Sequence, residues 1–435
     1  MPLEPGSPHE LDTAVASLGL SGTDDIPEIA VSGAESAMPN ERTAVTHVLP
    51  GLQVAKELLQ GFRDFLNTAK IELGPSTVTD LLAAYLSSQF LLFAGPSGTG
   101  KSTVARALLH FFTEPDAGEV IEARRQLIGP EDVAGYLSPI SGAYVRTPEL
   151  GALLRIGAPG AGSTPGLLVE EINLSPVEGY LAPFVHGLSG ITNDSVVWSL
   201  HSGDPSSATS VPRRIEFKPY PRLLGSINVD STALAPSPKV AARACVVLLE
   251  PPEELDLSKT LAGLTAQAAA LDPHAGSGAR LVGNPLEIFD VPEVDQDELV
   301  QHLTAVINEL RGFGQQGEPA SANPVTRRQA GQMLLYGAWF VLVAKAHEGL
   351  GGSLEADAAR LGVENAVLHY VLPTLPGAEF GLVLDRLTNA TNLADQGSGA
   401  NAVGALLKAR VNRLGSIGGD SLLAGRVLDF WDRLS

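Results

Sequence analysis

The short segment 95–102, Gly-Pro-Ser-Gly-Thr-Gly-Lys-Ser, limits the possible folds of this chain more than any other feature. Its glycines let successive backbone N–H groups converge on a polyphosphate, which carries too much charge for a few side chains to hold alone. The segment follows an apolar run at 90–94 and begins a helical pattern that reaches 112, so a helix dipole points at the phosphates. It therefore predicts a nucleotide-binding α/β fold, with Lys101 on the β- and γ-phosphates and the Ser102 hydroxyl on Mg²⁺. The predicted phosphate-binding residues are Gly95, Pro96, Ser97, Gly98, Thr99, Gly100, Lys101, Ser102 and Thr103.

Acidic side chains for the metal and the attacking water are expected at the end of a neighbouring strand. The apolar run 166–169 ends in Glu170 and Glu171. Their order places Glu170 at the metal side and Glu171 as the general base that orients water. The usual metal-side residue is Asp, and the additional methylene of Glu170 moves its carboxylate outward. Either the metal is then held through water or hydrolysis is slow.

Polar residues on later segments complete the candidate site. Asn228 ends the apolar run 223–228, where a neutral amide can bond both the γ-phosphate and the attacking water. Arg243 follows a short Ser-Pro-Lys segment and could reach the nucleotide of a neighbouring subunit, as arginine fingers do. Arg327 and Arg328 begin a helical pattern, where one guanidinium could pair with the γ-phosphate and the other be solvated.

The spacing of apolar segments predicts the architecture. Short apolar runs separated by helical or looped connections are typical of a mostly parallel sheet. Helical periodicity predicts a helix over 54–66 and a second one with Thr77 as its cap and Asp80 three residues on. A hairpin or surface insertion is expected around 196–198. The strand candidates are 90–94, 119–123, 166–169, 223–228 and 245–249.

Four regions follow from these patterns. We expect a flexible acidic arm over 1–48, because it combines excess acidic residues with little periodicity. The α/β nucleotide-binding domain spans 49–250, and an irregular connection follows over 251–294. Residues 295–435 are predicted to form a helical lid and a helical C-terminal region.

Charge and apolar content argue against direct contact with nucleic acid and against a membrane-spanning segment. The chain has 29 basic and 49 acidic residues, a net charge of −20, so nucleic acid is expected to be held only indirectly or through a partner. The longest apolar stretch, 333–344, is shorter than the roughly 18 residues that cross a bilayer. Together with the lone Cys245 and the absence of a recognisable secretion signal, this predicts a cytoplasmic protein with no membrane segment.

Taken together, the motifs resemble those of the AAA+ NTPases over residues 78–345. The resemblance is to the branch that contains MoxR-like proteins, dynein-like modules and the motor subunit of modified-cytosine restriction systems. Two C-terminal segments, 371–377 and 430–435, are similar to the tails of restriction-type motors. The segments that carry the branch resemblance are 128–136, 142–150, 171–178, 227–232 and 237–240.

The resemblance implies a fold and a set of roles. The fold is an AAA+ P-loop NTPase domain, a mostly parallel sheet flanked by helices, followed by a helical lid. Two positions depart from the family pattern, because Glu170 replaces Asp and Ala242 stands where an acid usually precedes the finger arginine. The implied roles are Lys101 and Ser102 as phosphate and metal ligands, Glu170 and Glu171 as the second-motif acids, Asn228 as first sensor, Arg243 as the finger acting in trans, and Arg328 as second sensor.

The resemblance also implies an activity and its context. We expect Mg²⁺-dependent hydrolysis of ATP, or of GTP as in the restriction motor, by a homo-oligomer, usually a hexameric ring. The leading hypothesis is a motor or switch for a partner protein, such as a nuclease subunit, in a bacterial restriction or anti-phage defence complex. The N-terminal arm is too short and acidic to read DNA, which assigns target recognition to another polypeptide. The alternatives are a MoxR-like chaperone that remodels a partner protein and a nucleotide-bound scaffold with weak hydrolysis.

Overall fold

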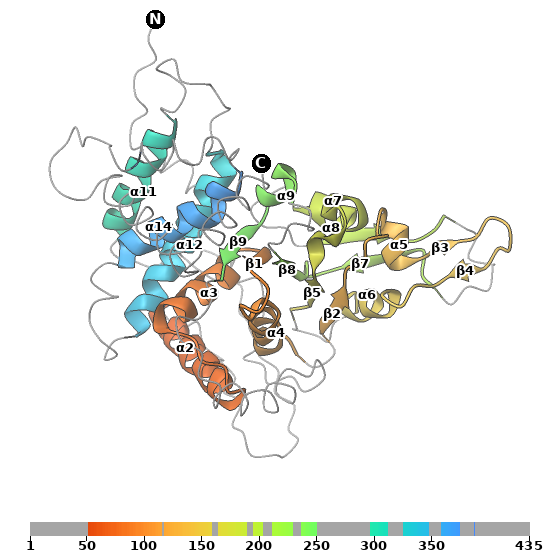
Figure 1. Cartoon of the computed structure of the whole chain (residues 1–435), viewed down its shortest axis with the longest axis horizontal. Coiled ribbons are helices and arrows are strands. Elements are labelled where there is room, and N and C mark those ends of the chain that lie inside the picture. The colour runs from red at the N-terminus through yellow and green to blue at the C-terminus, as the bar shows by residue number, and fades with distance from the viewer. Residues whose placement is uncertain are drawn as a thin grey trace, which may run out of the picture.

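The core of the protein is a five-stranded parallel sheet in the order β2-β5-β8-β1-β9 (Figure 1). The computed structural model describes residues 51–114, 117–158, 164–188, 195–202, 211–228, 236–249, 296–311, 325–347, 358–374 and 387. All five predicted strands are confirmed, each within one residue at either end. The strands are β1 (Phe90–Gly95), β2 (Gly118–Glu122), β5 (Gly166–Glu170), β8 (Arg222–Asn228) and β9 (Cys245–Leu248).

The sheet is flanked by helices and buried along its central strands. Every residue of β1 is buried, as expected for a parallel strand covered on both faces. Helix α4 (Lys101–Phe112) packs against β1, β5 and β8, and α6 (Leu150–Ile156) packs against β2. The shorter segments after the sheet strands are α5 (Pro130–Ala134), η1 (Ile172–Leu174), α7 (Val177–Tyr180), α8 (Ala182–Gly187) and α9 (Pro238–Ala241).

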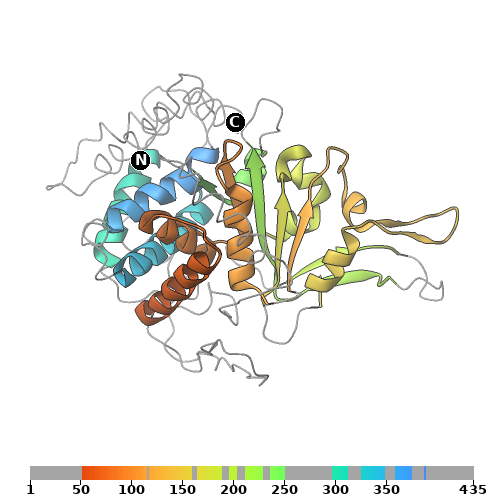
Figure 2. The same cartoon turned by 60° about the horizontal axis from the view of Figure 1, so that its bottom comes forward.

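Two hairpins extend from this α/β part. The first pairs β3 (Tyr136–Leu137) with β4 (Tyr144–Val145), and the second pairs β6 (Val196–Ser199) with β7 (Arg214–Phe217). The second confirms the hairpin expected around 196–198. Figures 1 and 2 show the β3–β4 hairpin projecting at the end of the molecule opposite the C-terminal helices.

Helices from the N-terminal and C-terminal parts of the described chain gather beside β9, away from the β3–β4 hairpin. The C-terminal helices are α11 (Gln296–Arg311), α12 (Arg327–Ala346) and α14 (Ala358–Tyr370), followed by η2 (Leu372–Thr374). They pack on one another, and α12 also packs on α2 (Gly51–Thr68) and α3 (Pro75–Ser87) (Figure 2). Helical structure predicted after 295 is thus present in the described part of that region. None of the described helices is both long enough and apolar enough to cross a bilayer.

The start of α3 corrects the predicted cap. The helix begins at Pro75 after Gly74, so Thr77 lies inside the first turn and is not the cap. Proline at the first helical position has no N–H to leave unpaired and a dihedral angle that suits a helix, which explains the earlier start. Asp80 is buried and belongs to no capping box. Helix α3 is enclosed from Val78 to Ser87 because the sheet and α12 both cover it.

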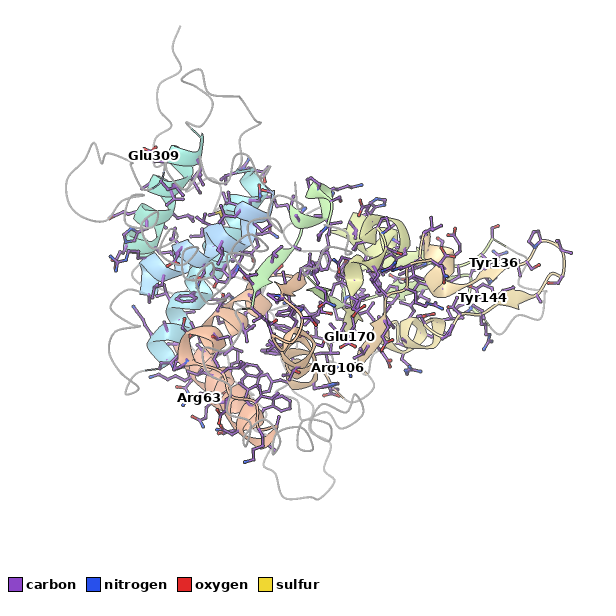
Figure 3. The ribbon with its side chains drawn as sticks, in the orientation of Figure 1. Arg63, Arg106, Tyr136, Tyr144, Glu170 and Glu309 are labelled. Atoms are coloured by element: carbon purple, nitrogen blue, oxygen red, sulfur yellow. The ribbon has the colours of Figure 1, made fainter. Side chains whose placement is uncertain are left out.

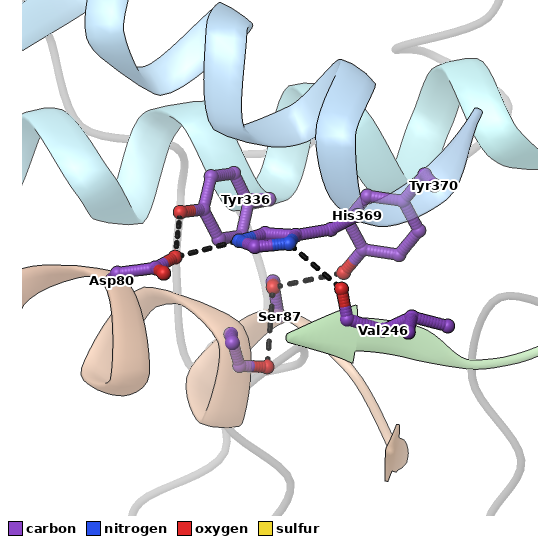
Figure 4. Close-up of polar contacts among 7 residues, drawn as sticks. Asp80, Ser87, Val246, Tyr336, His369 and Tyr370 are labelled. Carbon is purple, nitrogen blue, oxygen red and sulfur yellow. Dashed lines mark hydrogen bonds and ion pairs between the residues drawn. The ribbon is translucent and has the colours of Figure 1, made fainter. Parts of the chain in front are cut away.

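A buried polar network joins α3 to the C-terminal helices and the sheet (Figure 4). Tyr336 on α12 donates its hydroxyl to Asp80 Oδ1, and His369 Nε2 on α14 lies 2.7 Å from the same oxygen. The other ring nitrogen of His369 lies 2.8 Å from the carbonyl oxygen of Val246 in β9. Asp80, Tyr336 and His369 are all buried, so these bonds connect four elements where water does not compete.

Several sequence predictions fall outside the described residues. They are the acidic arm over 1–48, the connection over 251–294, and the C-terminal segment 430–435 with most of the chain after 374. The division into four regions therefore stays a prediction.

Candidate functional site

The phosphate loop connects β1 to α4 at the carboxyl end of the sheet. Gly98 and Gly100 have φ angles of +84° and +83°, in the left-handed region that glycine enters without a steric penalty. Gly100 is the residue before the first helical position, and Lys101 begins α4. The unpaired N–H groups of this helix start therefore face the loop, which is the arrangement that binds phosphate.

Lys101 lies within the loop and not in solvent. Its side chain is buried, and Nζ donates a hydrogen bond of 2.6 Å to the carbonyl oxygen of Pro96. Thr99 donates its hydroxyl to the same oxygen at 3.0 Å. Ser102 is exposed on the first turn of α4, so its hydroxyl is accessible to a metal ion. The loop thus holds a cation beside the position that phosphates would take.

The predicted acids and sensor residue meet at the same edge of the sheet. Gly95 of β1 is directly opposite Asn228 of β8 in the parallel register, and β5 lies on the other side of β8. Because the carboxyl ends of parallel strands meet at one edge, Glu170, Glu171 and Asn228 lie beside the loop. The Nδ2 atom of Asn228 donates a 3.2 Å hydrogen bond to Glu171 Oε1.

Glu171 adopts an uncommon backbone conformation. Its φ and ψ of 50° and 40° are left-handed, which costs about 1–2 kcal/mol for a residue with a Cβ atom. Its N–H donates a 3.0 Å hydrogen bond to the hydroxyl of Ser226 in β8, which supports this turn. The strand thus ends abruptly, with the Glu171 side chain bonded to the next strand.

Glu170 has a partner that sequence reasoning missed. Arg106 on α4 donates from Nε to Glu170 Oε1 at 3.0 Å and from Nη2 to Oε2 at 2.9 Å (Figure 3). This hydrogen bond raises the pKa of Arg106 above its usual value, and the charges of Glu170 and Glu122 contribute further. The only signal in the sequence is a charged residue one and a half turns after Lys101 in a helix that covers the sheet.

The two predicted arginines lie together at the opposite end of the strands. Arg243 precedes Cys245, which pairs with Leu91 near the start of β1. The phosphate loop begins after Gly95. With a strand rise near 3.3 Å per residue, Leu91 at the Arg243 end of β1 and Gly95 at the loop end are about 13 Å apart. Arg243 donates from Nη1 to the carbonyl oxygen of Lys239 at 2.8 Å.

Arg328 is a neighbour of Arg243 and not of the phosphate loop. It donates from Nη1 to the carbonyl oxygen of Leu188 at 2.8 Å, just after α8. Burial and, to a smaller extent, the positive charge of Arg243 lower its pKa to about 10, while Tyr220 opposes the shift. Within the described parts of the chain, the Nε atoms of both arginines are buried without a hydrogen-bond partner. Of the two adjacent arginines at the start of α12, Arg327 is exposed and Arg328 is half-buried.

The residues beside the loop suit Mg²⁺. This ion prefers oxygen ligands and retains several waters, so it is held by one or two protein groups together with substrate phosphates. Ser102 offers a hydroxyl, and Glu170 and Glu171 offer carboxylates at the adjacent strand end. The donor chemistry therefore fits magnesium bound with a nucleotide.

Comparisons with known proteins give only distant similarities. No protein-family model matches the sequence, and no curated protein matches it. Among solved structures, the chain is similar to a predicted ATPase from Cytophaga hutchinsonii, with 12% identity, a TM-score of 0.39, and coverage of 68% of this chain and 82% of that chain. It is also similar to a full-length MCM homologue from Methanopyrus kandleri, with 14% identity, a TM-score of 0.34, and coverage of 77% of this chain and 63% of that chain. Because these identities and TM-scores are low, only the geometry of this chain supports roles for the site residues.

Proposed function

We propose that this protein binds a nucleoside triphosphate with Mg²⁺ and hydrolyses it as an oligomeric AAA+ enzyme. The observation that carries the proposal is the Asn228–Glu171 hydrogen bond of 3.2 Å at the strand ends beside the phosphate loop. A glutamate oriented by a neutral amide, next to a loop built for phosphates, is the arrangement that activates a water for attack on the γ-phosphate.

Each side chain has a distinct task in this scheme. The loop N–H groups and Lys101 hold the phosphates, and Ser102 and Glu170 are the metal-side ligands. Magnesium, when bound, neutralises charge that develops on the phosphate oxygens. Glu171 orients the attacking water and accepts its proton, and Asn228 keeps the Glu171 carboxylate aimed at that water. ATP is the proposed nucleotide, with GTP as the alternative.

The placement of the arginines supports an oligomer. Arg243 and Arg328 lie at the end of the strands opposite the phosphate loop of their own chain. Two neighbouring guanidinium groups repel each other unless an anion lies between them or beside them. A triphosphate bound to a neighbouring copy provides that anion, and head-to-tail contacts of this kind form a ring when the rotation between copies closes. We propose a hexameric ring, in which Arg243 is the finger and Arg328 the second sensor.

The biological context is proposed from the sequence resemblance alone. The ring acts as a motor or switch for a partner protein, with a nuclease subunit of a restriction or anti-phage defence complex as the proposed partner. The net charge of −20 supports contact with nucleic acid only through that partner.

One observation favours the scaffold alternative. Arg106 already binds both carboxylate oxygens of Glu170, which leaves this residue less available to a metal ion. A scaffold that binds nucleotide and scarcely hydrolyses it would release phosphate far more slowly than it exchanges nucleotide. Steady-state phosphate release, compared with bound nucleotide per subunit, distinguishes the two functions.

A mixing experiment tests the shared site. Lys101→Ala removes the phosphate cation from a subunit, and Arg243→Ala removes the finger that the subunit offers to its neighbour, so each variant alone is expected to be inactive. A 1:1 mixture regains activity because about a quarter of the interfaces combine an intact loop with an intact finger. Phosphate release by each variant and by the mixture is the measurement.

The control for this experiment is Arg327→Ala. Arg327 is exposed beside Arg328, and the variant is expected to hydrolyse nucleotide at the normal rate without mixing. If the mixture stays inactive while both variants still assemble, the arginines do not act across a subunit interface.

A further inference from the structure

The structure assigns a task to Arg106, which none of the phosphate-loop motifs includes. We infer that Arg106 is a positioning residue that competes with magnesium for Glu170, and so sets the magnesium concentration at which the site fills. The inference rests on the proposed function, because it concerns the metal side of the same site.

The contact is a two-point ion pair between α4 and β5. Both nitrogen-to-oxygen distances, 3.0 Å and 2.9 Å, lie in the range of strong charge-assisted hydrogen bonds. The side chains of Arg106 and Glu170 are 30% and 14% exposed, so water only partly screens the attraction. Figure 3 labels Arg106 and Glu170 next to each other, beside α4. Both oxygens of the proposed metal-side acid are therefore already bonded to a cation.

The pair gives a physical reason for Glu in place of Asp at position 170. Arg106 lies five residues after Lys101, which is about 7.5 Å further along the helix axis. An aspartate carboxylate would lie nearer its backbone by about one C–C bond, roughly 1.5 Å. At that reach the two short contacts with the guanidinium would lengthen or one would be lost. The longer side chain is what allows Glu170 to face Arg106.

A second carboxylate makes the competition stronger. Glu122 at the end of β2 is directly beside Glu170 in the parallel register, and its charge also acts on Arg106. Arg106 thus offsets the repulsion between two acids on neighbouring strands. Removing its charge leaves a more negative strand edge, which attracts a divalent cation more strongly. Magnesium and Arg106 therefore act on Glu170 as alternatives.

Magnesium titrations test the inference. Binding of a fluorescent ATP analogue is followed against magnesium concentration in the full-length protein and in Arg106→Gln. The half-saturating magnesium concentration is expected to fall about tenfold in the variant, as for the loss of one strong charge-assisted contact. Arg106→Lys keeps the charge but not the two-point geometry, so its half-saturating magnesium concentration should lie between those of the full-length protein and Arg106→Gln.

Two more variants separate competition from a structural role. Glu170→Asp shortens the reach to Arg106 and is expected to lower the magnesium requirement as well, whereas Arg106→Gln combined with Glu170→Asp should add little. Arg63→Gln on α2 removes an equal charge away from the site and should leave the titration unchanged. If Arg106→Gln folds and its magnesium requirement is unchanged or higher, the inference is overturned.

A metal-only readout keeps this inference separate from the proposed function. Mn²⁺ binding without nucleotide, measured by electron paramagnetic resonance, should be tighter in Arg106→Gln than in the original protein. Failure of the original protein to bind any nucleotide would contradict the proposed function, while equal Mn²⁺ binding by the two proteins would contradict the role of Arg106.

Discussion

Replacing Glu171 with Gln is expected to leave nucleotide binding unchanged and to slow hydrolysis by at least about a hundredfold, the usual contribution of a general base. Glutamine has nearly the same shape and can still accept the hydrogen bond from Asn228, which is 3.2 Å long in the native pair. It cannot accept a proton from the attacking water. Single-turnover hydrolysis, measured beside the affinity for a fluorescent nucleotide, separates these two effects.

A matched control for this variant is Glu216→Gln in the β6–β7 hairpin. Glu216 is exposed, and the change removes the same charge away from the phosphate loop, so hydrolysis should continue at the normal rate. Hydrolysis at an undiminished rate in Glu171→Gln would mean that another group activates the water.

Replacing Asp80 with Ala is expected to lower the free energy of unfolding by about 2–6 kcal/mol, because two buried groups lose their acceptor at roughly 1–3 kcal/mol each. The substitution leaves the Tyr336 hydroxyl and the His369 ring without their shared acceptor in a buried place. Asp80→Asn keeps the size and one acceptor oxygen, so it should lose less. Urea denaturation followed by circular dichroism measures both variants.

The comparison for this loss is Asp64→Ala on the exposed face of α2. Asp64 accepts a 2.9 Å hydrogen bond from Gln60 in solvent, so its loss should change stability by no more than about 0.5 kcal/mol. Equal small losses for Asp80→Ala and Asp64→Ala would show that the buried network contributes little to stability.

Much of the fold can be predicted from the sequence because its signals are local. A strand buried on both faces appears as a continuous apolar run, as in β1 and β9, and all five strand candidates fall within one residue of the strands of the sheet. The phosphate loop contains its own glycines and its own helix start. Glu170, Glu171 and Asn228 could be assigned to one edge because each directly ends an apolar run, and parallel strands end on the same side.

The parts that could not be predicted depend on residues that are distant in the sequence. Arg106 meets Glu170 only after α4 packs on β5, and no periodicity marks that contact. Asp80 suits a helix start by its spacing, yet its partners come from α12 and α14. The position of Arg328 depends on where α12 packs, so its residue type indicates a cation but not the end of the sheet at which that cation lies.

The network around Asp80 has a mechanical consequence. Swinging α12 and α14 about β9 would break hydrogen bonds of His369 and Tyr336 where no solvent replaces them. A hinge at that place is costly, so the network favours movement of these helices together with the sheet. In the proposed ring, nucleotide hydrolysis would then shift whole subunits relative to one another, and Arg328 on α12 would move together with the sheet of its own subunit.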